Sequence, residues 1–143
     1  MSVSRILAEK GRDVQTIPPH RTLADAARTM AERRIGAMVV TGADGSVLGI
    51  ISERDIVRAM AESASASLDE PVSRRMTAKV VTASEAMSIE TAMEMMTAGK
   101  FRHLPVVEDG RLVGIISIGD VVKRHIEKIE AETKAMRDYI AMA

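Results

Sequence analysis

The chain contains two copies of one unit, and this duplication limits its fold more than any other feature. Residues 16–40 align with residues 82–106 at an offset of 66, without a gap. A one-residue deletion in a turn then shifts the offset to 65, so that residues 45–57 align with residues 110–122. Units of about 65 residues are marginal alone. We therefore expect the two copies to pack as one body related by a pseudo-twofold axis.

Each copy contains the sequence Gly-Ile-Ile-Ser-x-x-Asp, in which a short apolar strand runs into a helix. The helices are expected to begin at Ser52 and Ser117, because Ser with an acidic residue three positions later forms a capping box. The same arrangement suits a ligand, since a helix start offers free N–H groups to an anion. A carboxylate next to a hydroxyl also holds vicinal hydroxyls of a ribose. Asp55 and Asp120 are compatible with both roles.

Apolar spacing and turn residues predict the order β–α–β–β–α in each copy. In the first copy the expected elements are a strand over 14–17, a helix from Thr22, a buried strand over 35–41, a strand over 46–51 and a helix from Ser52. On the last helix of each copy, the residues expected to face the core are Ile56, Val57 and Met60, and Val121, Val122 and Ile126.

The expected fold class is α/β (α+β), with two tandem β-α-β-β-α repeats and a long C-terminal helix. The first domain is assigned to residues 1–68, including an N-terminal helix from Ser2 or Ser4 to Gly11 that reads as an arm. The small polar stretch 63–67 is expected to be the end of the helix from Ser52 and a linker. The second domain is assigned to residues 69–143.

The C-terminal stretch departs from the repeat and forms a heptad-like apolar seam. Its members are Val122, Ile126, Ile129, Thr133, Met136 and Ile140, with spacings of 4, 3, 4, 3 and 4. A seam of this kind fits either a helix that folds back on its own domain or a helix that pairs with a second copy or another partner.

Composition narrows the classes of function. Twenty basic residues balance twenty acidic ones and only two residues are aromatic, which argues against nucleic acid and anionic membranes. Cysteine is absent, and His20, His103 and His125 lack a metal-ligand spacing. We therefore expect no enzyme, no metal site and no disulfide. No run of 18 apolar residues occurs, which predicts a soluble, cytoplasmic protein.

The two Gly-Ile-Ile-Ser-x-x-Asp sequences, the strand Phe101-Arg102-His103-Leu104-Pro105-Val106-Val107 and the Thr-Ile-Pro or Thr-Ala-Ser turns resemble the cystathionine-β-synthase (CBS) domain. The resemblance covers nearly the whole chain. Two such domains in tandem resemble a Bateman module, which binds adenosyl ligands such as AMP, ATP, NAD(H) or S-adenosylmethionine between its repeats.

The resemblance also implies a role for each candidate residue. The carboxylates of Asp55 and Asp120 would accept ribose hydroxyls, and Ser52 and Ser117 would bind near the sugar or phosphate. The backbone around Thr16–Pro18 and Thr82–Ser84 would contact the adenine. The basic candidates for the phosphates are Arg54, Lys100, Arg102 and His103. The full candidate set is Thr16, Ile17, Pro18, Gly36, Ala37, Ser52, Arg54, Asp55, Thr82, Ala83, Ser84, Lys100, Phe101, Arg102, His103, Leu104, Ser117, Gly119 and Asp120.

The two copies differ at these positions, so the two sites are not expected to bind alike. Arg54 aligns with Gly119, and Ile35-Gly36-Ala37 aligns with Phe101-Arg102-His103. The Phe101 ring fits either a place in the core or a wall against a base.

The sequence therefore predicts a regulatory sensor that binds an adenine nucleotide (AMP, NAD(H) or ATP), forms a homodimer and changes its geometry or partner affinity on binding. The alternative is a constitutive interaction scaffold that acts through the C-terminal helix. The preferred nucleotide, the occupancy of each site and the regulated protein are left open.

Overall fold

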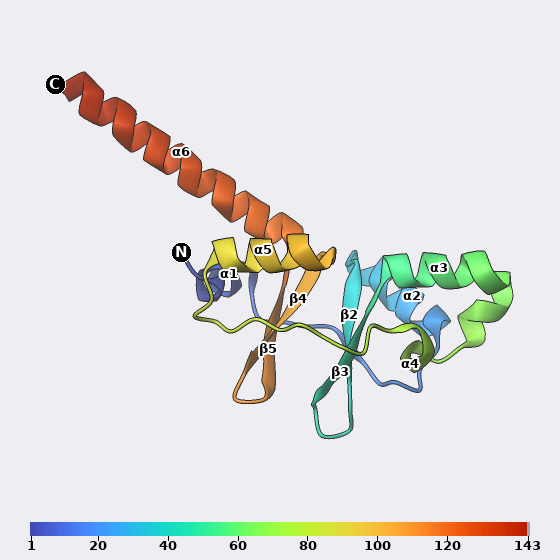
Figure 1. Ribbon diagram of the computed structural model, residues 1–143. Helices are drawn as coiled ribbons and strands as arrows, with labels where there is room; N and C mark the ends of the chain where they lie inside the picture. Colours follow the sequence, from blue (N-terminus) through green and yellow to red (C-terminus); the bar gives the residue numbers. More distant parts are fainter. Residues whose placement is uncertain (143) are drawn as a thin grey trace.

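The computed structural model describes residues 1–142 and contains the duplicated order of elements that the sequence predicts (Figure 1). The first repeat consists of β1 (Thr16–Ile17), α2 (Leu23–Arg33), β2 (Ala37–Thr41), β3 (Val47–Ser52) and α3 (Glu53–Ser63). The second consists of α5 (Ile89–Gly99), β4 (His103–Glu108), β5 (Arg111–Ser117) and α6 (Ile118–Met142). The remaining elements are α1 (Val3–Lys10), the 3-10 helix η1 (Ala64–Asp69) and α4 (Val72–Arg75).

Each repeat is built on a small sheet. In the first, β1 runs parallel to β2 and β2 pairs antiparallel with β3. In the second, β4 and β5 form an antiparallel pair, and the counterpart of β1 is reduced to a single parallel bridge between Ala83 and Val106. The strand expected over 14–17 is shorter than predicted, because it begins at Thr16 and the prolines after Ile17 end it.

Capping boxes begin the helices where the sequence predicts them. The Thr22 and Ser52 side chains accept hydrogen bonds from the backbone N–H groups of Asp25 and Asp55, and both carboxylates bond back to the capping residue. Ser88 caps α5 through the N–H of Thr91. Helix α3 ends at Ser63, within the stretch where its end was predicted, but the linker expected after it is the 3-10 helix η1.

The N-terminal helix α1 belongs to the core of the second repeat. Its residues Val3, Ile6 and Leu7 are buried in one cluster with core residues of α5, β4 and β5. The short helix α4 takes the same place on the first repeat, where Val72 joins the other core cluster. The sequence-based assignment of α1 to the first domain therefore does not describe its packing. The boundary between residues 68 and 69 remains a prediction.

Matching backbone hydrogen bonds show that α1 and α4 dock in the same way. The N–H of Leu23 donates to Glu70 at 2.9 Å, and the N–H of Ile89 donates to Met1 at 3.3 Å. Each docked segment also packs over a glycine of the neighbouring strand. A Cβ added at Gly49 would lie 2.6 Å from Met76 Sδ, and one added at Gly114 would lie 2.6 Å from Leu7 Cδ2. Glycine is required at both positions because only a residue without a Cβ permits this approach.

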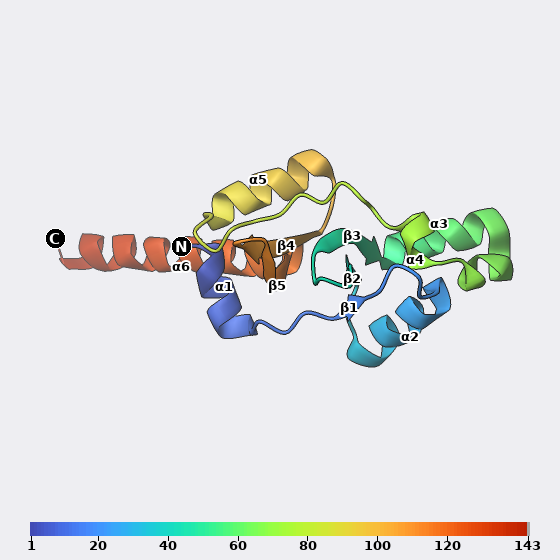
Figure 2. The same cartoon turned by 90° about the horizontal axis from the view of Figure 1, so that it is seen from below.

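Helix α6 extends well beyond the rest of the chain (Figures 1 and 2). Every residue from Ile129 to Met142 is exposed, and Lys128, just before them, is half-buried. This part of α6 therefore does not fold back on its own domain. The prediction of which residues of α3 and α6 face the core was also partly wrong. Ile56 and Val121 are buried, whereas Val57, Met60, Val122 and Ile126 are exposed. No helix among residues 1–142 is long and apolar enough to cross a membrane.

Candidate functional site

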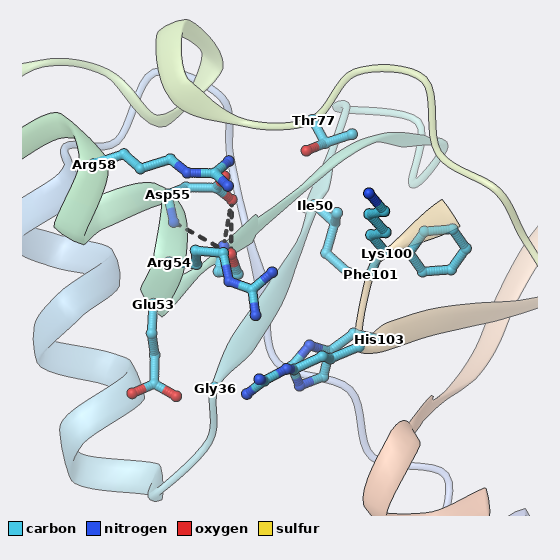
Figure 3. Close-up of a pocket in the computed structure, with 12 residues that line it drawn as sticks. Gly36, Ile50, Glu53, Arg54, Asp55, Arg58, Thr77, Lys100, Phe101 and His103 are labelled. Carbon is cyan, nitrogen blue, oxygen red and sulfur yellow. Dashed lines mark hydrogen bonds between the residues drawn. The ribbon is translucent and has the colours of Figure 1, made fainter. Parts of the chain in front are cut away.

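A cavity of about 210 Å³ lies between the two repeats, at the start of α3. One wall comes from β3 and α3 of the first repeat, and the other from the turn that joins α5 to β4 in the second (Figure 3). Eight of the candidate residues line it: Gly36, Ser52, Arg54, Asp55, Lys100, Phe101, Arg102 and His103. The chain thus brings together residues that are up to 67 positions apart in the sequence.

Four further residues line this cavity and were not predicted: Ile50, Glu53, Arg58 and Thr77. Arg58 lies one helical turn after Arg54, a spacing that places both on one face of a helix, so this signal was present in the sequence. Thr77 follows α4 and pairs with Ile50 through two backbone hydrogen bonds of 2.9 and 3.0 Å. No local pattern in the sequence indicates that pairing.

The carboxylate of Asp55 is held by the capping box through one of its two oxygens. Its Oδ2 accepts hydrogen bonds from the N–H of Ser52 at 2.8 Å and from Ser52 Oγ at 2.9 Å. Among residues 1–142 no hydrogen bond reaches Oδ1. The capping interpretation is therefore confirmed, and it leaves room for the second role.

Asp120 has the same capping geometry but also has a charged partner. Its Oδ2 accepts from the N–H of Ser117 at 2.8 Å and from Ser117 Oγ at 3.0 Å, and in addition from Lys10 Nζ at 2.6 Å. Partial burial opposes its ionisation, but the bonds from Lys10 and Ser117 outweigh burial and hold the pKa of Asp120 below its ordinary value. Only Asp120 therefore has a charged partner, whereas Oδ1 accepts no hydrogen bond in either carboxylate among residues 1–142.

The cavity is rich in basic side chains. Four cationic side chains, Arg54, Arg58, Lys100 and Arg102, line it together with two carboxylates. None of these four forms an ion pair within the described part of the chain. The positions that align with Arg54 and Arg102 are both glycine. The start of α3 adds a favourable dipole for an anion.

His103 is partly buried at the edge of the cavity. A Cβ added at Gly36 would lie 3.5 Å from the imidazole Cε1, so the ring packs against that glycine. Burial lowers the pKa of His103 below its ordinary value of 6.5, and the positive charges of Lys10 and Arg102 act in the same direction. The carboxylates of Glu53 and Asp120 oppose this shift without reversing it. His103 is therefore mainly neutral at pH 7.

This depressed pKa predicts a specific pH dependence of stability. The folded chain binds the His103 proton less well than the unfolded chain, so unfolding free energy decreases as pH falls from about 6.5 toward the lowered folded pKa. We expect His103→Gln to lose less stability than the native chain between pH 7.5 and 5.5, measured by urea unfolding. His20→Gln, which removes an imidazole from an exposed loop, is the control. Parallel curves for the native chain and His103→Gln would contradict the prediction.

The other candidate residues lie outside this cavity. Thr16, Ile17 and Pro18 line a separate hollow with Arg21 and Asp25. Ala37, Ala83 and Leu104 are buried core residues. Thr82 is exposed and Ser84 is half-buried, and Ser117, Gly119 and Asp120 lie at the start of α6. Phe101 packs against the second core, as one of its two expected roles requires, and it also lines the cavity; its contact with a base remains a prediction.

Comparison with known proteins identifies the class to which this fold and site belong. The CBS domain family profile matches residues 4–62 and 72–127, which are the two repeats. The chain therefore belongs to the CBS-domain family and is a tandem pair of these domains.

Solved structures agree with this assignment. The CBS-domain containing protein ATU1752 from Agrobacterium tumefaciens is 51% identical, with a TM-score of 0.85 over 87% of this chain and 99% of that one. CBS domain protein PAE2072 from Pyrobaculum aerophilum, complexed with AMP, is 31% identical, with a TM-score of 0.76 over 84% and 89%. The CBS domain pair of MJ0100, in complex with 5'-methylthioadenosine and S-adenosyl-L-methionine, is 25% identical, with a TM-score of 0.80 over 90% and 98%.

Proposed function

We propose that this chain is a regulatory module that binds an adenine nucleotide in the cavity at Asp55. The observation that carries the proposal is that one cavity between the repeats contains both the unbonded carboxylate oxygen of Asp55 and four cationic side chains. The AMP complex of one relative and the adenosyl complexes of another support the ligand class. The ligand class proposed is AMP, ATP or NAD(H), and no catalytic step is proposed.

Each part of the ligand has a partner in the cavity. Asp55 Oδ1 accepts hydrogen bonds from the ribose hydroxyls, since Oδ2 is already used in capping. Arg54 and Arg102 bind phosphate, because a guanidinium donates two parallel hydrogen bonds to phosphate oxygens. The base lies between Ile50 and the Phe101 ring, the two large apolar groups of the lining. Contact of the base with Thr82–Ser84 remains a prediction, since that segment does not line the cavity.

Binding in this place couples the two repeats. A ligand that contacts both α3 and residues 100–103 stabilises the arrangement of the two repeats in which both walls of the cavity can contact it at once. Any partner that binds the same arrangement better then gains affinity when the nucleotide is present. This is the regulatory step that we propose.

Spectroscopy and mass spectrometry of the purified chain test the proposal directly. The chain has no Trp and one Tyr, so a bound nucleotide would dominate its absorption near 260 nm. The released molecule is identified by mass spectrometry, and the stripped chain is titrated with AMP, ATP and NADH by calorimetry. Absence of both a co-purified adenosyl compound and any binding heat would favour the scaffold alternative.

We also propose that the chain is a homodimer that covers the exposed apolar side of α6. Ile126, Ile129, Met136 and Ile140 are each at least 48% exposed and follow the heptad-like spacing. A lone projecting helix is marginal in water unless a neighbour packs on it. We expect light scattering to give twice the chain mass, and Ile129→Glu with Met136→Glu to give a monomer. A monomeric native chain at tens of micromolar would exclude this contact.

A further inference from the structure

The last turn of α1 has no counterpart on the first repeat. Helices α1 and α4 dock alike, but α1 spans eight residues, from Val3 to Lys10, whereas α4 spans only four. After α4 the chain becomes extended and Thr77 pairs with Ile50. The additional turn of α1 instead carries Glu9 and Lys10 past the glycine strand and toward the start of α6.

Two ion pairs hold this turn on α6. Lys10 Nζ lies 2.6 Å from Asp120 Oδ2, and Glu9 pairs with Arg124 one turn further along. The turn is presented by a fixed helix, because Val3, Ile6 and Leu7 are buried in the second core. Figure 2 shows α1 beside the base of α6. Lys10 is therefore placed at Asp120 by the fold and not by a flexible loop.

The first repeat has no equivalent contact. The residue that aligns with Lys10, at the offset of 69 that relates α1 to α4, is Lys79. Lys79 is exposed and forms no ion pair within residues 1–142. The inter-repeat cavity reaches Ser52 and Asp55 but does not extend to Ser117 or Asp120. The Asp55 carboxylate lines the inter-repeat cavity and has no ion-pair partner within residues 1–142, whereas the Asp120 carboxylate lies outside that cavity and is paired with Lys10.

We infer that the last turn of α1 closes the second nucleotide site, with Lys10 acting as an internal partner of Asp120, so that each chain binds one nucleotide at Asp55. This inference rests on the proposed function. Lys10 also lies close enough to His103, which lines the inter-repeat cavity, to affect its charge. Its ammonium group neutralises the carboxylate that a ribose would use in the second site.

The test is the number of nucleotides bound per chain. Calorimetric titration of the ligand-stripped chain with AMP is compared between the native chain and Lys10→Gln combined with Glu9→Gln. We expect one AMP per native chain and two per variant chain. Lys79→Gln, the matched change on the first repeat, should keep one. Thermal unfolding followed by circular dichroism checks that the variant remains folded.

Several results would overturn the inference. They are two AMP molecules bound to the native chain, a single AMP still bound to the variant, or a native site that is lost in Asp120→Asn but kept in Asp55→Asn. If no AMP, ATP or NADH binds either chain, the proposed function fails. The contact itself is then judged by carbon NMR of Asp120, whose pKa should rise toward its ordinary 3.8 in Lys10→Gln. An unchanged Asp120 pKa would show that Lys10 does not engage this carboxylate.

Discussion

Asp55→Asn is expected to raise the dissociation constant for AMP about ten- to hundredfold, while Asp120→Asn changes it little. Asn still accepts the capping hydrogen bond from Ser52, but it loses the charge and one of the two acceptor oxygens. Hydrogen bonds to a charged group contribute about 1.5–3 kcal/mol, which gives this fold-change. We expect Asp120→Asn to remove no contact to this ligand, because Asp120 lies outside the inter-repeat cavity and is paired with Lys10.

Calorimetry of the two stripped variants with AMP and NADH measures this difference, and urea unfolding provides the control. The unfolding free energy of Asp55→Asn should fall by less than about 1 kcal/mol, because the cap is retained. Unchanged binding isotherms in Asp55→Asn would leave the Ser-x-x-Asp sequence with a capping role only. An equal loss of affinity in Asp55→Asn and Asp120→Asn would show that both carboxylates hold ligand.

The elements that the sequence predicted correctly are those with local signals. Thr22, Ser52 and Ser117 are each followed three residues later by the aspartate that completes a cap, and apolar runs mark β2 and β3. The repeated sequence also predicted that the two copies would pack as one body, and residues 52–55 of the first repeat share a cavity with residues 100–103 of the second. The cavity lining agrees with that expectation.

The features that the sequence did not predict depend on contacts between distant residues. Lys10 and Asp120 are 110 positions apart, and no pattern around either residue indicates the pair. The docking of α1 on the second repeat has only a weak signal, in which Val3 and Leu7 align with Val72 and Met76 at an offset of 69. Extending the repeat comparison beyond the strands would have found it. The exposed Val57 was misassigned because a helix with apolar residues on two sides does not reveal which side is covered.

Leu7→Ala is expected to lower the unfolding free energy by about 2–5 kcal/mol, the range for removing a large buried aliphatic side chain. Leu7 is 1% exposed and fills the space left by the missing side chain of Gly114, so its removal leaves a cavity between α1 and β5. Leu48→Ala, on the exposed side of β3, is the control and should cost less than about 1 kcal/mol. Urea unfolding at pH 7.5 measures both.

The region of the chain that Leu7→Ala destabilises is as informative as the decrease in unfolding free energy. If α1 is part of the second core, Leu7→Ala should speed amide hydrogen exchange in β5 and α5, while β2 and β3 of the first repeat are affected less. Faster exchange confined to the first repeat would instead assign α1 to that repeat, which follows it in the sequence. Because Lys10 follows Leu7 on the same helix, loosening α1 should also weaken the Lys10 contact with Asp120. Leu7→Ala is therefore expected to admit a second nucleotide, as the loss of Lys10 does, but at a cost in stability that Lys10→Gln avoids.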